Sequence, residues 1–92
     1  MGRSSRPRPQ RLAAKLLRVR EALGVSQAAM VELLAQPKVH PAHVSGYERG
    51  EREPPLPVLL RYARLAGVCL DALVDDELDL PAKLPAKPRH KA

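Results

Sequence analysis

Glycine and proline residues divide this chain into short segments, and the division restricts it to folds made of short helices. Gly24, Gly50 and Gly67 each follow a run of helical periodicity, at the position where glycine commonly ends a helix. Pro37 excludes one long helix across the middle of the chain, because proline lacks the N–H that a helix interior needs. The spacing predicts helices over about 10–23, 27–34, 41–49, 56–66 and 70–74.

Two of these helices also have a recognisable start. Ser26 suits the N-cap of the second helix, since its hydroxyl can accept a hydrogen bond from an N–H of the first turn. Pro41 suits the first position of the third helix, with His40 near its cap, because no N–H is needed there. Apolar residues at helical spacing are predicted to face the core, namely Leu12, Leu16, Val19, Leu23, Met30, Val31, Leu34, Leu59, Leu60, Ala63, and Leu65 or Ala66.

The composition agrees with a small helical domain. The chain has 92 residues, and a chain of this size buries roughly 60% of its unfolded surface in a single core. Hydrophobic residues make up 45% of it, but aromatic residues only 2%, namely Tyr47 and Tyr62. A core of Leu, Val and Ala favours helices packed on helices over a β-sandwich. We therefore expect an all-α fold, with no deep cavity for a cofactor and no small-molecule ligand.

Cysteine and hydropathy exclude several classes of protein. Cys69 has no second cysteine to pair with, so an internal disulfide and a cysteine-based zinc site are excluded. The basic, proline-rich start is not followed by the apolar run of a secretory signal. No stretch approaches the roughly 18 apolar residues of a membrane span. These features favour a cytoplasmic protein.

Positive charge is concentrated at the two ends of the chain. The net charge is +6, and it divides into +7 over residues 1–20, −1 over 21–74, −4 over 75–79 and +4 over 80–92. A nearly neutral domain between basic ends indicates a polyanionic partner, nucleic acid before an anionic membrane surface. Tails that only improve solubility are the alternative.

The same pattern gives the domain boundaries. Residues 1–9 are predicted as a flexible basic arm, 10–79 as the folded domain and 80–92 as a Pro/Lys-rich disordered tail that repeats Leu-Pro-Ala-Lys. The acidic residues Asp75, Asp76, Glu77 and Asp79 lack the spacing of a calcium loop, so we expect them on a solvated surface.

Two stretches resemble a known family. Residues 16–27 read LLRVREALGVSQ and residues 44–54 read VSGYERGEREP. In this order they resemble the lambda-repressor-like, Cro-type helix-turn-helix domains, also called the xenobiotic-response-element family. Leu59, Ala63, Gly67-Val68 and residues 70–73 continue the match, so the resemblance covers about residues 11–74. It implies a compact five-helix domain that binds double-stranded DNA with its third helix in the major groove.

The third helix is the expected DNA-reading element. At about 100° per residue, Val44 and Tyr47 face inward, while Ala42, Gly46 and Arg49 face outward. The predicted base contacts are His40, Ala42, His43, Ser45 and Gly46.

Two interpretations of this outer face remain open. Pro41, Ala42 and Gly46 cannot make the bidentate hydrogen bonds that distinguish bases. Either the smooth surface lets the helix sit close to the bases, with Ala42 against a thymine methyl group, or the helix no longer reads sequence well. The connection before the third helix is longer than usual for the family, which predicts a loose turn at 35–38.

The resemblance also implies contacts outside the third helix. Arg20 and Glu48 match a pair that forms an internal ion pair, and two unrelated surface charges are the alternative. Gln27 matches a glutamine that binds a backbone phosphate, at a helix N-terminus that favours anions. The flanking bases Arg49, Arg52 and Arg11 are further candidate phosphate contacts, with a purely solvated arm as the alternative for the last.

No catalytic arrangement is evident. His40 and His43 have no carboxylate or thiol beside them, so no metal site is predicted. Cys69 has no base partner and is not expected to be a nucleophile. The chain is not predicted to be an enzyme.

The sequence therefore predicts a repressor-like transcription regulator specific for double-stranded DNA. The alternative is a protein-interaction or antitoxin-like module of the same fold with only non-specific nucleic-acid binding. A homodimer on two half-sites is a further expectation, and no membrane partner is expected. The candidate dimer surface comprises Leu70, Leu73, Val74 and Leu78, and packing on the chain's own core is an equal alternative for the first three. When bound to DNA, the protein is expected to be associated with the nucleoid.

Overall fold

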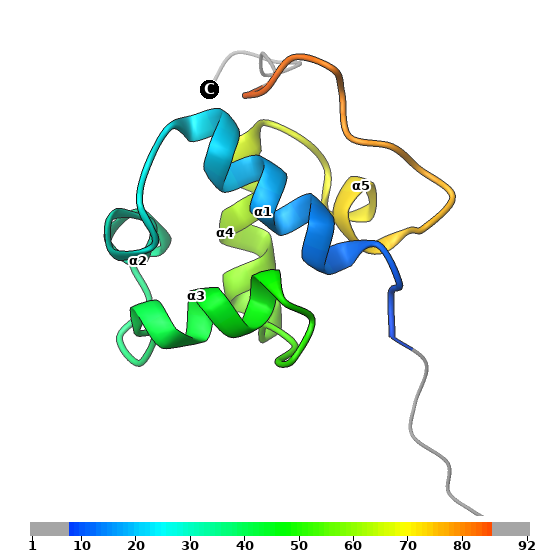
Figure 1. Ribbon diagram of the computed structural model, residues 1–92. Coiled ribbons are helices and arrows are strands. Elements are labelled where there is room, and N and C mark those ends of the chain that lie inside the picture. Colours follow the sequence, from blue (N-terminus) through cyan, green and yellow to red (C-terminus); the bar gives the residue numbers. More distant parts are fainter. Residues whose placement is uncertain (1–7, 86–92) are drawn as a thin grey trace, which may run out of the picture.

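The computed structural model describes residues 8–85, and within them every regular element is a helix. The five helices are α1 (Leu12–Leu23), α2 (Gln27–Leu34), α3 (Pro41–Glu48), α4 (Leu56–Ala66) and α5 (Leu70–Val74) (Figure 1). The all-α prediction with five helices is confirmed. Most of the predicted basic arm and residues 86–92 of the predicted tail lie outside the described residues.

Local signals account for the ends of these helices. Gly24 and Gly67 follow α1 and α4 in the left-handed conformation, both at φ 73° and ψ 30°, which glycine adopts without strain. The Ser26 hydroxyl accepts the N–H of Ala29 at 3.0 Å and caps α2 as predicted. Local sequence signals therefore explain where these helices begin and end.

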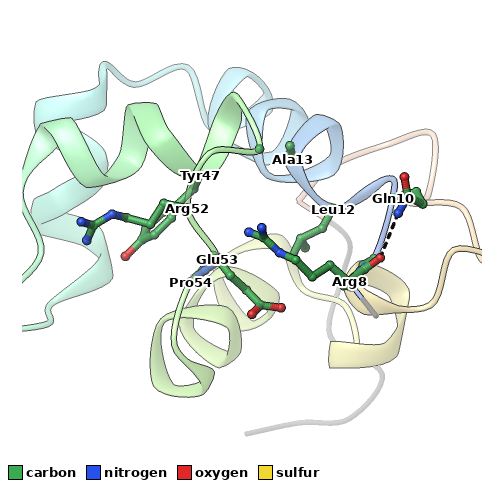
Figure 2. A pocket seen from close by; sticks show the side chains of 10 residues that line it. Arg8, Gln10, Leu12, Ala13, Tyr47, Arg52, Glu53 and Pro54 are labelled. Carbon is green, nitrogen blue, oxygen red and sulfur yellow. Dashed lines mark hydrogen bonds between the residues drawn. The ribbon is translucent and has the colours of Figure 1, made fainter. Parts of the chain in front are cut away.

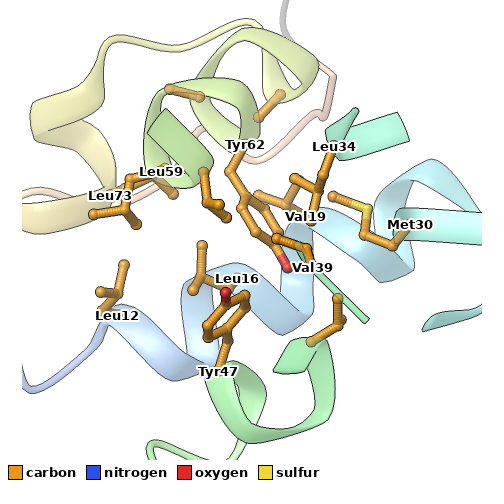
Figure 3. Packing of buried hydrophobic residues seen from close by; sticks show 14 of the residues in the cluster. Leu12, Leu16, Val19, Met30, Leu34, Val39, Tyr47, Leu59, Tyr62 and Leu73 are labelled. Carbon is orange, nitrogen blue, oxygen red and sulfur yellow. The ribbon is translucent and has the colours of Figure 1, made fainter. Parts of the chain in front are cut away.

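The core lies where all five helices meet (Figure 3). Tyr62 of α4 lies at its centre, fully buried among leucine and valine side chains. The seven largest fully buried side chains are Tyr62, Leu16, Met30, Leu34, Leu73, Val19 and Val44. Both aromatic residues of the chain serve packing, since Tyr47 is also buried.

Two predicted placements are corrected. Leu60 lies on the outside of α4 with an exposed fraction of 40%, because the buried stripe of this helix follows Val58, Leu59 and Tyr62 instead. Leu73 has no exposed surface, so it cannot form part of a dimer interface.

The Tyr62 hydroxyl leads to a stability prediction. It is the buried side-chain N or O atom without a hydrogen-bond partner among residues 8–85, and burial raises the pKa of Tyr62 strongly. A buried polar group without a partner costs about 1–3 kcal/mol. Tyr62→Phe is therefore expected to raise the free energy of unfolding in urea by about 1 kcal/mol.

Tyr47→Phe is the matched control for this prediction. Its ring is also buried, but its hydroxyl is not among the buried atoms that lack a partner in the described part of the chain. Tyr47→Phe should bring no gain. A loss of stability in Tyr62→Phe would contradict the assignment of an unsatisfied hydroxyl.

The chain after α5 runs back along α1 as an extended segment, residues 75–85, which we call the C-terminal strap (Figure 1). The Asp76 carboxylate accepts the backbone N–H groups of Gln10 at 2.8 Å and Arg11 at 3.0 Å, and it therefore ties the residues just before α1 to the strap. These hydrogen bonds lower the pKa of Asp76. The Arg11 guanidinium also pairs with Asp79, and this pairing lowers the pKa of that carboxyl.

Basic side chains of α1 continue the attachment. Lys15 is only 5% exposed, and its ammonium donates to the backbone oxygens of Ala72, Asp75 and Leu78 at 2.8, 3.0 and 2.8 Å. Arg18 donates to the backbone oxygens of the strap residues 81 and 82, both at 2.8 Å. Three bases at helical spacing thus hold the strap against one side of α1.

The strap differs from the sequence prediction in two ways. The acidic residues are not merely solvated, because Asp76 accepts two backbone N–H groups just before α1 and Asp79 pairs with Arg11. The packed part of the chain also continues past residue 79, since Leu80 is buried in the core. The described part of the predicted tail, 80–85, is irregular, with bends at 82–85, and is attached to the domain.

Candidate nucleic-acid interface

One end of α3 is open to solvent, while its middle is anchored in the core. Val44 and Tyr47 are buried, as predicted, so the helix cannot rotate without exposing them. Pro41 and Ala42 are exposed, and His43 and Ser45 are half-buried. The first turn of α3 therefore presents Pro41 and Ala42 to solvent, with the rings of His40 and His43 beside them.

Gly46 does not belong to this open surface, which corrects its prediction as a base contact. The chain folds back after α3, and the N–H groups of Glu51 and Arg52 donate to the Gly46 oxygen at 2.9 and 3.3 Å. A Cβ at Gly46 would lie 3.2 Å from the Cβ of Arg52. Gly46 is consequently buried, and it is small because Arg52 lies across it.

The histidines stabilise the start of α3. The His40 N–H donates to Nδ1 of His43 at 3.2 Å, and the two rings lie 5.2 Å apart. This bond requires Nδ1 of His43 to be unprotonated. Partial burial of the ring, followed by the charges of Arg52 and His40, lowers the pKa of His43. His43 is thus a neutral cap at pH 7, and its other ring nitrogen is a donor.

A charged cluster joins α3 to the two helices before it. Arg20 of α1 and Glu48 of α3 form an ion pair at 2.6 Å, and a second guanidinium N–H reaches the same carboxylate at 3.1 Å. Arg20 also donates to the Val25 oxygen at 2.9 Å, and the amide of Gln27 donates to Glu48 at 3.1 Å. Hydrogen bonding to Glu48 raises the pKa of Arg20. We call Arg20, Gln27 and Glu48 the α3 anchor.

The long connection between α2 and α3 is held at both ends. Ala35 ends α2 in the left-handed conformation with φ 54°, which glycine would adopt at lower cost. Arg61 of α4 donates to the Leu33 oxygen at 3.0 Å, and Val39 packs into the core. The residues on either side of the predicted loose turn are thus fixed, while Ala35, Pro37 and Lys38 within it are exposed.

The comparison with protein families decides what this arrangement is. A family model described as a helix-turn-helix domain matches residues 11–76. The chain belongs to this helix-turn-helix family. Helix-turn-helix domains are DNA-binding domains, and α2 and α3 form the motif, with α3 as the recognition helix. No curated protein and no solved structure matches the chain.

The basic residues around the helix-turn-helix differ in the partners that their guanidinium groups bind. Arg49 pairs with Glu51 at 2.9 Å on the surface, where solvent screens the pair and leaves the guanidinium accessible. Arg52 is exposed beside the recognition helix. Arg11, predicted as a phosphate contact, bonds the Asp76 backbone oxygen and Asp79 in the strap, and its contact with a phosphate stays a prediction.

Two hollows flank the loop that follows the recognition helix. A cavity of about 220 Å³ lies between that loop and the start of α1, lined by Leu12, Ala13 and Gly50 among others (Figure 2). A groove of about 310 Å³ lies on the other side, beside His43. Tyr47 and Arg52 line both.

The described residues offer no metal or membrane chemistry. Residues 8–85 contain no group of three or more His, Cys, Asp or Glu side chains placed to hold a metal ion. No helix in the same residues has both the length and the apolar character to cross a membrane. Sequence reasoning missed Lys15 and Asp76. Lys15 could have been found, because it falls within the apolar stripe of the first helix, between Leu12 and Leu16.

Proposed function

We propose that this chain is a sequence-specific transcription regulator that binds double-stranded DNA with α3 in the major groove and represses by occupying its site. The observation that carries the proposal is the α3 anchor together with the exposed first turn of the same helix. The anchor fixes the tilt of α3 relative to α1 and α2. A rigid helix with a smooth exposed end fits the major groove, which admits one α-helix.

Specific contacts are assigned to the open turn of α3. Ala42 is placed to touch a thymine methyl group, and the polar atoms of His40, His43 and Ser45 are placed at base edges. Of these, His43 presents a ring N–H, because its Nδ1 is occupied by the cap. Few polar groups are available, so shape and deformability of the duplex contribute to the preference.

Backbone contacts are assigned to the edges of the motif. The amide of Gln27 has two N–H donors, and only one of them is bonded to Glu48 in the structure. The other is available to a phosphate at the N-terminus of α2, which favours an anion. Arg49 at the end of α3 supplies a second phosphate contact. The net charge of +6 steers the protein to DNA.

The experiment is selection from random duplexes at about 0.15 M salt, followed by sequencing of the retained DNA. Enrichment of a short site supports the proposal, and a palindromic site would add a dimer on two half-sites. Retention without enrichment, lost as salt increases, would reject sequence specificity in favour of the module with non-specific nucleic-acid binding.

Two substitutions of alanine by glutamate localise the interface. Ala42→Glu adds a negative charge at the exposed start of α3, where the helix dipole tolerates it but DNA does not. It is expected to weaken binding to the selected duplex by at least about tenfold, equal to about 1.4 kcal/mol. Ala22→Glu makes the same change at an exposed position of α1 and should leave binding within about twofold. Equal effects of the two would place the interface elsewhere.

A further inference from the structure

The start of the recognition helix lacks a side chain that can discriminate bases by paired hydrogen bonds. Pro41 and Ala42 are exposed but apolar, and Gly46 is buried. Bidentate recognition of a base edge needs two donors, or a donor and an acceptor, on one rigid group. A specific protein with this helix must take that group from another element.

Arg52 is positioned to supply it. Its Cβ and Cδ lie 3.2 and 3.8 Å from where a Cβ of Gly46 would stand, so its stem lies directly on α3. Figure 2 shows the Arg52 side chain beside Tyr47, running from the loop back beneath the helix. The end of the side chain also lies near enough to His43 for its charge to contribute to the low pKa of that ring. Arg52 thus occupies the place of a missing α3 side chain.

The guanidinium of Arg52 is uncommitted in the part of the chain that the structure describes. No hydrogen bond or ion pair joins it to another group of residues 8–85, whereas Arg20, Arg49 and Arg61 each bond a carboxylate or a carbonyl. Its stem lies on α3 at Gly46 and lines the groove beside His43 and Tyr47. A stem that lies on the recognition helix, with an open and planar guanidinium, suits paired hydrogen bonds to a base edge.

We infer that Arg52 reads a guanine edge in the major groove from outside the recognition helix, and that Gly46 is the gap that admits it. The inference rests on the proposed function. A guanidinium donates two parallel hydrogen bonds to O6 and N7 of guanine, which discriminates against other bases by about 1–3 kcal/mol. A phosphate contact by the same residue would carry no sequence information.

The test repeats the duplex selection with Arg52→Gln and measures salt dependence. The wild-type chain is expected to select a site with a guanine, and Arg52→Gln to lose the preference at that one position by about 5- to 150-fold. Preferences at the other positions should remain. Loss of the charge should also lower the slope of log affinity against log salt by up to about 0.9.

A remote arginine provides the matched control. Arg64→Gln removes the same charge in the last turn of α4, where the side chain is exposed. It should change no positional preference, and thermal unfolding should show both variants folded, since both sites are exposed.

The remaining outcomes separate this inference from the proposed function. If the wild-type chain selects a site and Arg52→Gln weakens all sequences equally, Arg52 contacts only phosphate and the inference is wrong, while the proposed function stands. If the selected site contains no G·C pair, the inference is likewise wrong and the proposed function stands. If the wild-type chain selects no site, both are wrong.

Discussion

Arg20→Ala is expected to lower the free energy of unfolding by about 3–5 kcal/mol, because it leaves one partner of a buried ion pair alone. The Glu48 side chain is only 5% exposed, against 18% for Arg20. Without Arg20, the carboxylate retains the single N–H of Gln27, and the Val25 oxygen loses its donor. For a domain of this size, such a loss lowers Tm by at least about 12 °C.

Arg49→Ala is the control for this prediction. It also breaks an arginine–glutamate pair, but both side chains are more than half exposed, at 62% and 63%. Exposed pairs contribute about 0–1 kcal/mol, so Tm should change little. Equal effects of Arg20→Ala and Arg49→Ala in thermal and urea unfolding would show that the α3 anchor does not stabilise the fold.

A double substitution shows whether the ion pair itself stabilises the fold, or whether the fold is destabilised only when one charged partner is left alone. Replacing both partners by apolar groups removes the stranded charge, so Arg20→Met with Glu48→Leu should recover much of the stability lost in Arg20→Ala. DNA binding should not recover, because the tilt of α3 is no longer set by directed hydrogen bonds. Recovery of both properties would mean that packing alone positions the recognition helix.

The fold could be predicted from the sequence because the signals that begin and end its helices are local. Gly24, Ser26, Pro41 and Gly67 act within one or two turns, and each ends or begins a helix as its own chemistry dictates. The burial of Val44 and Tyr47 also follows from helical periodicity alone. Such signals need no knowledge of what packs against the helix.

The candidate site was harder to predict from the sequence, because its decisive contacts join segments that are far apart in the chain. Helical periodicity places Gly46 on the outer face of the third helix, which is correct for an isolated helix. In the structure, the loop after α3 folds back and covers Gly46 with Arg52. Asp76 accepts the backbone N–H of Arg11 from a position 65 residues further along the chain. Periodicity within one helix cannot show a partner so distant in sequence, and this is why the contacts of Arg11 with the strap are not predicted.

Lys15→Met is expected to destabilise the protein by about 2–4 kcal/mol and to release the C-terminal strap. Hydrogen bonds from a charged donor contribute about 1.5–3 kcal/mol each, but water can replace part of them once the strap moves away. Methionine keeps the apolar stem of Lys15 and its packing, so the change isolates the three bonds from the ammonium to Ala72, Asp75 and Leu78.

Two measurements separate the strap from the rest of the domain. Urea unfolding gives the total loss, and native-state hydrogen exchange shows where protection falls. Protection should fall first at the N–H of Arg11, which the strap residue Asp76 accepts, while the centre of α4 keeps its protection until global unfolding. Lys38→Met removes the same charge at an exposed position and should change neither measurement. Uniform loss of protection in Lys15→Met would instead make the strap part of one cooperative unit with the core, with the buried ammonium as the link between them.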